Sequence, residues 1–386
     1  GAAGFAVAAA REPARAWTTV WANFLLWTGL AQAGVLFGAV LQTAKGHWGK
    51  GFRRLAEGMG AFLPVSFVLF LAMVLLGHEH IFPWLGEVEG HVNREWLNLG
   101  GVRWRNALGL LLLYGFSFWY LRVAWRPDAP LVAERLDGWR ARFVGWLAAG
   151  WRGDEAELER SRRLLARISP ALILLWAVVF TLLSYDLVMS LIPGFISVIW
   201  GPYYFVGGWL SMLGLLAVLA WWHRDRHGLA AQWGGWEFHD LGKLIFAFAI
   251  FWAYLWWSQY LVIWYGDLGR ETVFFEQRIP EGSWVYWLQM VLIFGLPFLL
   301  LLWRRPKKNP AWLALVGAIV LAGFWLERHL LVAPSVLEGV LETGWVEAAV
   351  SLGFVGLFGL SWSAFASTFP KVPIRETLVG EASTGP

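Results

Sequence analysis

The chain has 386 residues, of which 58% are hydrophobic and 15% charged, and its mean hydropathy is +0.53. Charged residues make up about a quarter of an ordinary soluble domain, so this composition excludes a soluble globular protein and predicts a polytopic membrane protein. The chain has no cysteine, which excludes iron–sulfur clusters, thiolate zinc sites, covalently attached haem and disulfides from the chain itself. Any role in electron transfer therefore requires partner proteins that carry the redox centres.

Nine apolar segments are long enough to cross a bilayer, whose core of roughly 30 Å takes about 20 helical residues. Runs of this length exclude barrel strands, so the sequence predicts an all-α fold. The stretch GAAGFAVAAA at residues 1–10 looks like the end of a preceding span, which would bring the total to ten. The expected spans cover residues 17–43, 60–83, 105–125, 168–191, 196–222, 239–265, 283–303, 310–327 and 345–366.

The order of the spans contains a weak internal repeat. Spans one to four and five to eight both begin and end on the same side, and the fourth span of each set ends near an acid, Asp186 or Glu327. This repeat predicts two parallel four-helix bundles related by an axis along the membrane normal. We expect a stub and outer linker at 1–16, a first bundle at 17–191, a second bundle at 196–327, a last span at 345–366 and a tail at 367–386.

Lysine and arginine are distributed unevenly between alternate connecting segments. One set of segments holds 20 of them and the other holds 5, an asymmetry that the positive-inside rule assigns to the cytoplasmic and outer sides. We therefore expect the C-terminus in the cytoplasm. The long cytoplasmic connection at 126–166 is expected to contain a short amphipathic helix on the membrane surface or against a partner. Because the basic residues lie in short loops, nothing indicates a nucleic-acid partner.

Three ionisable residues near the expected outer ends of spans are candidates for proton transfer: His78, Asp186 and Glu327. An ionisable side chain costs about 2.5–3.5 kcal/mol inside a membrane helix, so each one indicates a function or a partner. A buried carboxyl group without a partner tends to hold its proton, and an imidazole exchanges protons near neutral pH. The structural alternatives are an interfacial polar cap for His78, a helix–helix hydrogen bond for Asp186 and an interfacial salt bridge for Glu327.

Three further ionisable residues, His239, Asp240 and Lys243, lie at the expected cytoplasmic mouth of the sixth span. Asp240 and Lys243 are three residues apart, which favours a local ion pair, and an acid is stabilised at a helix N-terminus. A cap with a snorkelling lysine and a proton entry site explain this pattern equally well. In the second interpretation these residues are the inner members of a proton path whose outer members are His78, Asp186 and Glu327.

An aromatic stripe follows in the same span. Trp252, Trp256 and Tyr260 recur at helical spacing, and Gln259 lies beside them. A flat apolar slot that ends in polar groups suits a quinone ring, and helix–helix packing explains the same stripe. No metal site is expected, since His78 and His80 are two apart on a helix and point in different directions.

Several segments resemble the NrfD-like integral membrane subunits, and most closely the ActF type, the second NrfD-like subunit of alternative complex III. They lie within residues 17–335, and the run HDLGK–FWAY–WYG is the most specific. The matching segments are WANFLLWTGLAQAGVLFGAV, EGMGAFLPV, LLGHEHIFPW, SYDLVMSLIPGFISVIWGPYYFVGGW, HDLGKLIFAFAIFWAYLWWSQYLVIWYGDLGRETVFF and LERHLLVAPS.

The resemblance implies a cofactor-free subunit of a quinol:electron acceptor oxidoreductase in the bacterial cytoplasmic membrane. It implies ten spans, a sister NrfD-like subunit, an iron–sulfur subunit and c-type haem subunits. It also implies a quinone, such as menaquinone, near the outer face, and routes for protons. On this basis the candidate quinone contacts are His78, Tyr185, Asp186, Trp256 and Gln259.

Two other classes remain open. A secondary transporter has helices that are interrupted by glycine or proline at matching positions of two halves, whereas Pro297 in the seventh span has no counterpart in the third. A membrane scaffold would use its buried polar groups only to join helices.

Overall fold

The fold is described from a computed structural model, for residues 1–86, 93–226, 229–231, 233–279, 284–337 and 343–375. These residues form helices and no strands. Within them, eight helices are long and apolar enough to span a membrane, and the apolar segment Trp284–Leu300 is shorter. The expected all-α fold of a multi-pass membrane protein is therefore confirmed.

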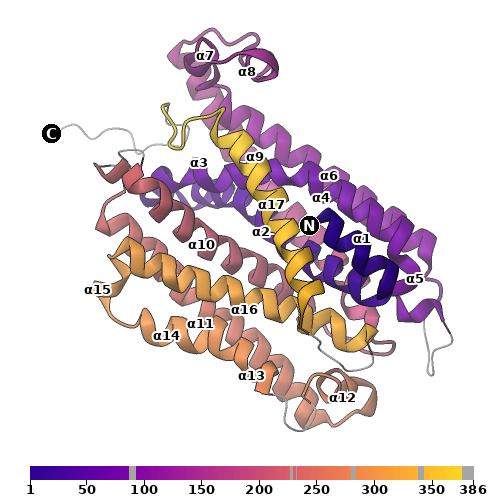
Figure 1. The fold of residues 1–386 in the computed structure, drawn as a ribbon. Coiled ribbons are helices and arrows are strands. Elements are labelled where there is room, and N and C mark those ends of the chain that lie inside the picture. The colour runs from indigo at the N-terminus through magenta and orange to yellow at the C-terminus, as the bar shows by residue number, and fades with distance from the viewer. Residues whose placement is uncertain (87–92, 227–228, 232, 280–283, 338–342, 376–386) are drawn as a thin grey trace.

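The helices follow one another with short connections (Figure 1). The first part of the chain forms α1 (Ala2–Arg11), α2 (Pro13–Ala44), α3 (Lys50–Gly58), α4 (Leu63–Ala72), α5 (His78–Ile81), α6 (Leu99–Trp125), α7 (Ala129–Ala133), α8 (Gly138–Ala148) and α9 (Glu155–Leu187). The second part forms α10 (Trp200–Arg226), α11 (Gly235–Gly266), α12 (Gly269–Glu276), α13 (Trp284–Met290), α14 (Leu296–Leu300), α15 (Arg304–Lys307), α16 (Pro310–Val336) and α17 (Trp345–Ala366).

Helix α2 occupies the centre of the molecule. It packs against α3, α9, α10, α16 and α17, and 89% of its most apolar stretch is buried, compared with 28% for α17. Its buried polar residues Asn23, Thr28 and Gln32 therefore face other helices and not lipid. The remaining spans surround α2 and expose more of their own surfaces.

Glycine allows a close crossing of α10 and α16. Gly214 of α10 lies against Gly317 of α16, and a Cβ atom on Gly317 would come within 2.4 Å of the Gly214 carbonyl oxygen. Small residues let helix backbones approach in this way, and close packing is the main attraction between helices in lipid. The pair therefore fixes how closely α16 can lie to α10, and with it the place of Glu327.

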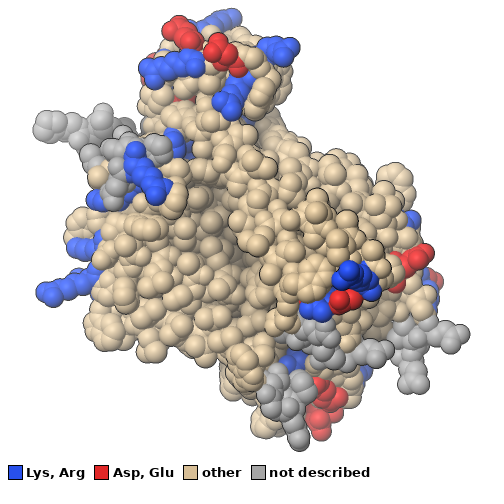
Figure 2. Space-filling view, in the orientation of Figure 1, with Lys and Arg blue, Asp and Glu red and all other residues tan. Residues whose placement is uncertain are grey.

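Charged side chains gather at the two ends of the molecule, and Figure 2 shows a broad band of other residues between them. At one end lie the segments with α7, α8 and α15, and at the other lie α5, α12 and α13 (Figure 1). A band without exposed charge is what the hydrocarbon core of a membrane requires.

Three boundaries differ from the expectation. Residues 155–168 form the first turns of α9 and not a separate amphipathic helix, because Asp154 caps that helix by accepting from the Glu157 amide at 2.7 Å. Two other helices, α7 and α8, occupy the 126–166 connection. Helix α16 continues to Val336, past the expected end of the eighth span, and α2 begins at Pro13, so the linker after α1 is only Glu12.

Candidate functional site

The carboxylate of Asp186 is held by side chains from α6 and the segment before it. Arg105 donates to both carboxylate oxygens, from Nε at 2.9 Å and from Nη2 at 2.8 Å. Asn106 donates to Oδ2 at 2.7 Å, and the indole of Trp96 donates to Oδ1 at 3.0 Å. Asp186 is fully buried, so these donors replace water as its partners. We call Trp96, Arg105, Asn106 and Asp186 the outer cluster.

Two of these residues stack on each other. The Arg105 guanidinium lies 4.0 Å from the centre of the Trp96 ring, a cation–π contact. Trp96 is 43% exposed and the Arg105 side chain is 23% exposed, so these two residues lie between the buried Asp186 and the surface of the protein. Glu87 and Glu89, which precede Trp96 in the segment before α6, lie outside the described residues.

A groove with a volume of about 450 Å³ adjoins the outer cluster, and we call it the outer groove. That volume falls within the roughly 300–1,000 Å³ of typical small-molecule pockets. Trp96 and Ser190 belong both to the groove wall and to the surroundings of Asp186, because Ser190 donates to the Asp186 carbonyl oxygen at 2.6 Å. The groove is lined by Asn93, Trp96, Leu97, Tyr185, Met189, Ser190, Ile192, Pro193, Gly194, Phe195 and Ile196.

His78 lies near the same end of the molecule but makes separate contacts. Its Nδ1 is 3.3 Å from Nη2 of Arg103, which also donates from Nε to the Val74 carbonyl oxygen at 2.8 Å. Arg103 and Arg105 are two residues apart on α6, so one helix end supplies an arginine to each site. Among the described residues, no hydrogen bond or ion pair joins His78 directly to Asp186.

Glu327 is buried on α16, far from bulk water, at 1% exposure. Its Oε2 lies 3.2 Å from Nη1 of Arg328, whose Nη2 donates to the Tyr204 carbonyl oxygen at 3.1 Å. His329 places Nδ1 at 2.7 Å from the Trp325 carbonyl oxygen. No contact of the described residues connects this acid with Asp186, so the expected outer proton-path residues form three separate sites.

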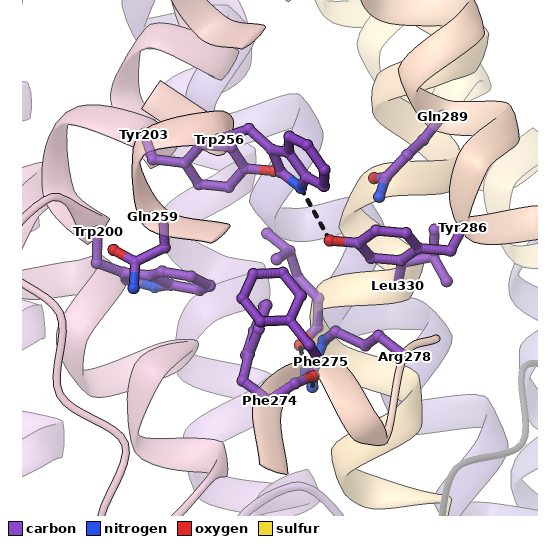
Figure 3. A pocket seen from close by; sticks show the side chains of 11 residues that line it. Trp200, Tyr203, Trp256, Gln259, Phe274, Phe275, Arg278, Tyr286, Gln289 and Leu330 are labelled. Carbon is purple, nitrogen blue, oxygen red and sulfur yellow. Dashed lines mark hydrogen bonds between the residues drawn. The ribbon is translucent and has the colours of Figure 1, made fainter. Parts of the chain in front are cut away.

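Trp256 and Gln259 line a chamber between α10, α11, α12, α13 and α16 (Figure 3). The indole of Trp256 donates to the Tyr286 hydroxyl at 2.8 Å, and Ser197 donates to Gln259. The cavity volume is only about 20 Å³, which accommodates about one water molecule. A quinone ring does not fit this chamber, so the two groups of expected quinone contacts lie in different places.

Arg278 forms one wall of the chamber and is 2% exposed. It donates to the carbonyl oxygens of Phe274 at 3.0 Å and Leu331 at 2.8 Å, and its guanidinium lies 4.0 Å from the Phe274 ring centre. Burial lowers the pKa of Arg278 to about 9, so the side chain remains cationic in neutral solution. It ties α12 to α16 and closes the chamber on that side.

The expected inner residues form a small cluster at the other end of the molecule. Lys243 Nζ lies 2.7 Å from Asp240 Oδ1, and His239 Nδ1 lies 3.4 Å from the same oxygen. Lys243 is the most exposed of the three. These contacts are the local ion pair that the three-residue spacing favours.

A second buried charge cluster lies at this end and was not expected from the sequence. Arg53 donates from Nε to Glu57 Oε1 at 2.7 Å, and Trp125 donates to Glu57 Oε2 at 2.8 Å. Arg54 donates to Asp128 at 2.6 Å. All four charged side chains are at most 2% exposed. The only available signal was the four-residue spacing of Arg53 and Glu57, which solvated helices also show.

Two polar pairs lie along α6 between these charged ends. Ser66 and Tyr114 share a hydrogen bond of 2.8 Å, and Gln32 donates to Ser117 at 2.8 Å. Leu110 and Leu113 occupy the buried face between Asn106 and Tyr114. The polar contacts of the described residues therefore do not form one continuous line from the outer cluster to Glu57.

The fold, the uncharged band and the paired charges inside it define a multi-pass, all-α membrane protein. No protein-family model matches the chain. No curated protein matches it either. Within the described residues, no three histidine or acidic side chains gather in a way that could hold a metal ion.

Proposed function

We propose that the chain is an NrfD-like membrane subunit, of the ActF type, in a respiratory complex that oxidises quinol. In this proposal it binds the quinol head group in the outer groove and helps to release the protons of quinol oxidation. Electrons pass to iron–sulfur and c-type haem centres in partner subunits, because this chain has no cysteine to bind such centres itself.

The observation that carries the proposal is the contact between the outer groove and a buried carboxylate. The groove is large enough for a head group and largely apolar, and Trp96 in its wall donates directly to Asp186. Tyr185, one of the expected quinone contacts, also lines the groove and precedes Asp186 in the chain. His78 belongs to a neighbouring site, and Trp256 and Gln259 belong to the small chamber, so we leave these three out of the head-group site.

The chemistry follows from the hydrogen bonds of Asp186. Arg105 and Asn106 donate to the two carboxyl oxygens of Asp186, which accept these hydrogen bonds. If the Trp96 indole moves away from Oδ1, that oxygen can accept a proton from a quinol hydroxyl in the groove. Each quinol loses two protons and two electrons: Asp186 accepts the protons one after the other, releasing the first outward before it takes the second, and the electrons leave for the partner centres. Arg105 then stabilises the carboxylate again when the proton is released outward.

The test replaces Asp186 with asparagine in the assembled complex and measures quinol turnover per assembled complex. We expect a loss of about 10²–10⁴-fold, the range that general acid–base groups contribute. Asp128→Asn is the matched control, because Asp128 is equally buried and also held by an arginine, but at the other end of the molecule. Equal turnover of the two variants would refute the role of Asp186.

A scaffold function is the second candidate, favoured by one specific observation. The outer cluster, the Arg53–Glu57 pair and the Arg54–Asp128 pair all place a buried charge next to an opposite charge on another turn or helix. Paired charges of this kind also serve only to hold helices together. In that case both Asp186→Asn and Asp128→Asn would reduce the amount of complex and leave the turnover of what assembles unchanged.

A further inference from the structure

Helix α15 concentrates positive charge at the end of the molecule opposite the outer groove. Four of the five residues at 304–308 are basic: Arg304, Arg305, Lys307 and Lys308. Figure 2 shows lysine and arginine side chains projecting from the part of the molecule where α15 lies in Figure 1. Basic residues are common in loops on the cytoplasmic side of membrane proteins, so this concentration alone does not identify a binding site.

Lys307 differs from an ordinary loop lysine, because it is only 7% exposed. Its aliphatic stem packs against Gly242 of α11, where a Cβ atom would lie 3.1 Å from Cβ and Cγ of Lys307. Its ammonium lies 4.9 Å from the centre of the Phe246 ring. Among the described residues, no side chain forms a hydrogen bond or ion pair with it. A buried cation of this kind requires a negative partner.

Asp240, an acid two residues before Gly242 on α11, is already engaged. Asp240 pairs with Lys243 at 2.7 Å and lies 3.4 Å from His239. Burial, followed by the charges of Arg304 and Lys243, lowers the pKa of Lys307. Lys307 therefore lies close enough to Arg304 and Lys243 to be affected by their charges, and no carboxylate of the described residues pairs with Lys307 itself.

An apolar surface continues from this position toward the uncharged band. Leu299, Leu302 and Trp303 are exposed there, and Phe246 packs against Phe298 with ring centres 5.4 Å apart. Lys308 lies 3.4 Å from the centre of the Trp236 ring, and such tryptophans are typical of the membrane–water interface. A ligand that suits this surface has a negative group at the interface and hydrocarbon chains below it.

We propose that Lys307, Arg304 and Lys243 bind the phosphate group of an anionic phospholipid whose acyl chains lie along Phe246, Leu299 and Leu302. Basic pockets between membrane helices are suited to such head groups. The lipid phosphate supplies the negative charge that Lys307 lacks. This inference is independent of the proposed quinol chemistry, which concerns the opposite end of the molecule.

The experiment uses the full chain, with the partners that purify with it, in a neutral detergent. Native mass spectrometry measures the binding of added phosphatidylglycerol and of phosphatidylcholine as the control lipid. We expect phosphatidylglycerol to bind at least tenfold more tightly than phosphatidylcholine. We also expect Lys307→Gln to remove most of that preference. Lys50→Gln, which removes one charge from an exposed position in another segment at this end, should keep it.

Three results would overturn the proposal. The first is the same lipid preference in Lys307→Gln and Lys50→Gln. The second is inorganic phosphate displacing phosphatidylglycerol at equal concentration, which would assign the site to a free anion. If Lys307→Gln does not fold, Arg304→Gln and Lys243→Gln are measured in its place. The third overturning result is then an unchanged preference for phosphatidylglycerol in both of these variants.

Discussion

Arg105 and Asp186 join α6 to α9 through two parallel hydrogen bonds, of 2.9 and 2.8 Å. This fork geometry matches a carboxylate on both oxygens, which a lysine cannot do. The pair therefore determines both the spacing of two membrane helices and the direction in which Asp186 presents its oxygens.

Removal of one partner of this pair should be costly. Arg105→Gln leaves the fully buried Asp186 without its counter-charge, and we expect a loss of about 3–5 kcal/mol in the free energy of unfolding. The double variant Arg105→Gln/Asp186→Asn should recover more than about 1 kcal/mol of that loss, since no isolated charge remains. Denaturant unfolding in detergent measures both values. Additive losses would show that the two side chains are not coupled.

The quinone site can be located by comparing two conservative variants. Tyr185→Phe removes a hydroxyl from a residue that lines the outer groove, and Gln259→Leu removes an amide from the small chamber. We expect Tyr185→Phe to weaken binding of a quinone analogue by about 1 kcal/mol, the typical value of one hydrogen bond, and Gln259→Leu to have no effect. Titration of the complex with the analogue tests this. A loss of binding in Gln259→Leu and none in Tyr185→Phe would place the head group in the chamber.

The glycine crossing of α10 and α16 predicts a steric effect. Gly317→Ala places a Cβ atom within 2.4 Å of the Gly214 carbonyl oxygen, so we expect a loss of about 1–3 kcal/mol in stability. Gly356→Ala is the control, because nothing lies within 4 Å of its new Cβ. The stability of Gly356→Ala should equal or slightly exceed that of the parent protein, since alanine favours helices. Thermal unfolding of the two variants side by side provides the measurement.

The lowered pKa of Lys307 predicts how stability depends on pH in neutral lipid. The folded chain releases this proton more readily than the unfolded chain, whose lysine has the ordinary value of 10.5. Between the lowered pKa and 10.5 the unfolded state binds more protons, so stability should rise with pH in that interval. Lys307→Gln should lack this rise, and Lys50→Gln should keep it. The test measures unfolding midpoints at a series of alkaline pH values, in phosphatidylcholine without anionic lipid. It shows whether stability rises or falls with pH.

The segments that cross the membrane were predictable because long apolar runs have few other uses. The nine expected spans correspond to eight long helices and the shorter segment Trp284–Leu300. The start of α9 was not predictable, because its first turns are amphipathic and charged like a surface helix. Glu155, Glu159 and Arg162 form ion pairs along those turns, which belong to the same helix as the membrane-crossing part.

The composition of the site was less predictable than its location. The sequence drew attention to Asp186, since an acid near a span end is unusual, but its partners Trp96, Arg105 and Asn106 lie about 80–90 residues earlier in the chain. Arg53 and Glu57 have the spacing of a solvated ion pair, and only the packing of α3 shows that both are buried. The spacing of residues along one helix indicates which of them can pair, whereas their burial depends on helices that are distant in sequence.

The enclosed position of α2 bears on how the protein is made. This helix is synthesised before α10, α16 and α17, yet those later helices cover much of its surface. Until α17 emerges from the ribosome, Asn23 lacks the Ser351 hydroxyl to which its amide donates at 3.0 Å. The newly inserted helix must therefore wait, beside the insertion machinery or among lipids, for the second half of the polypeptide to enclose it.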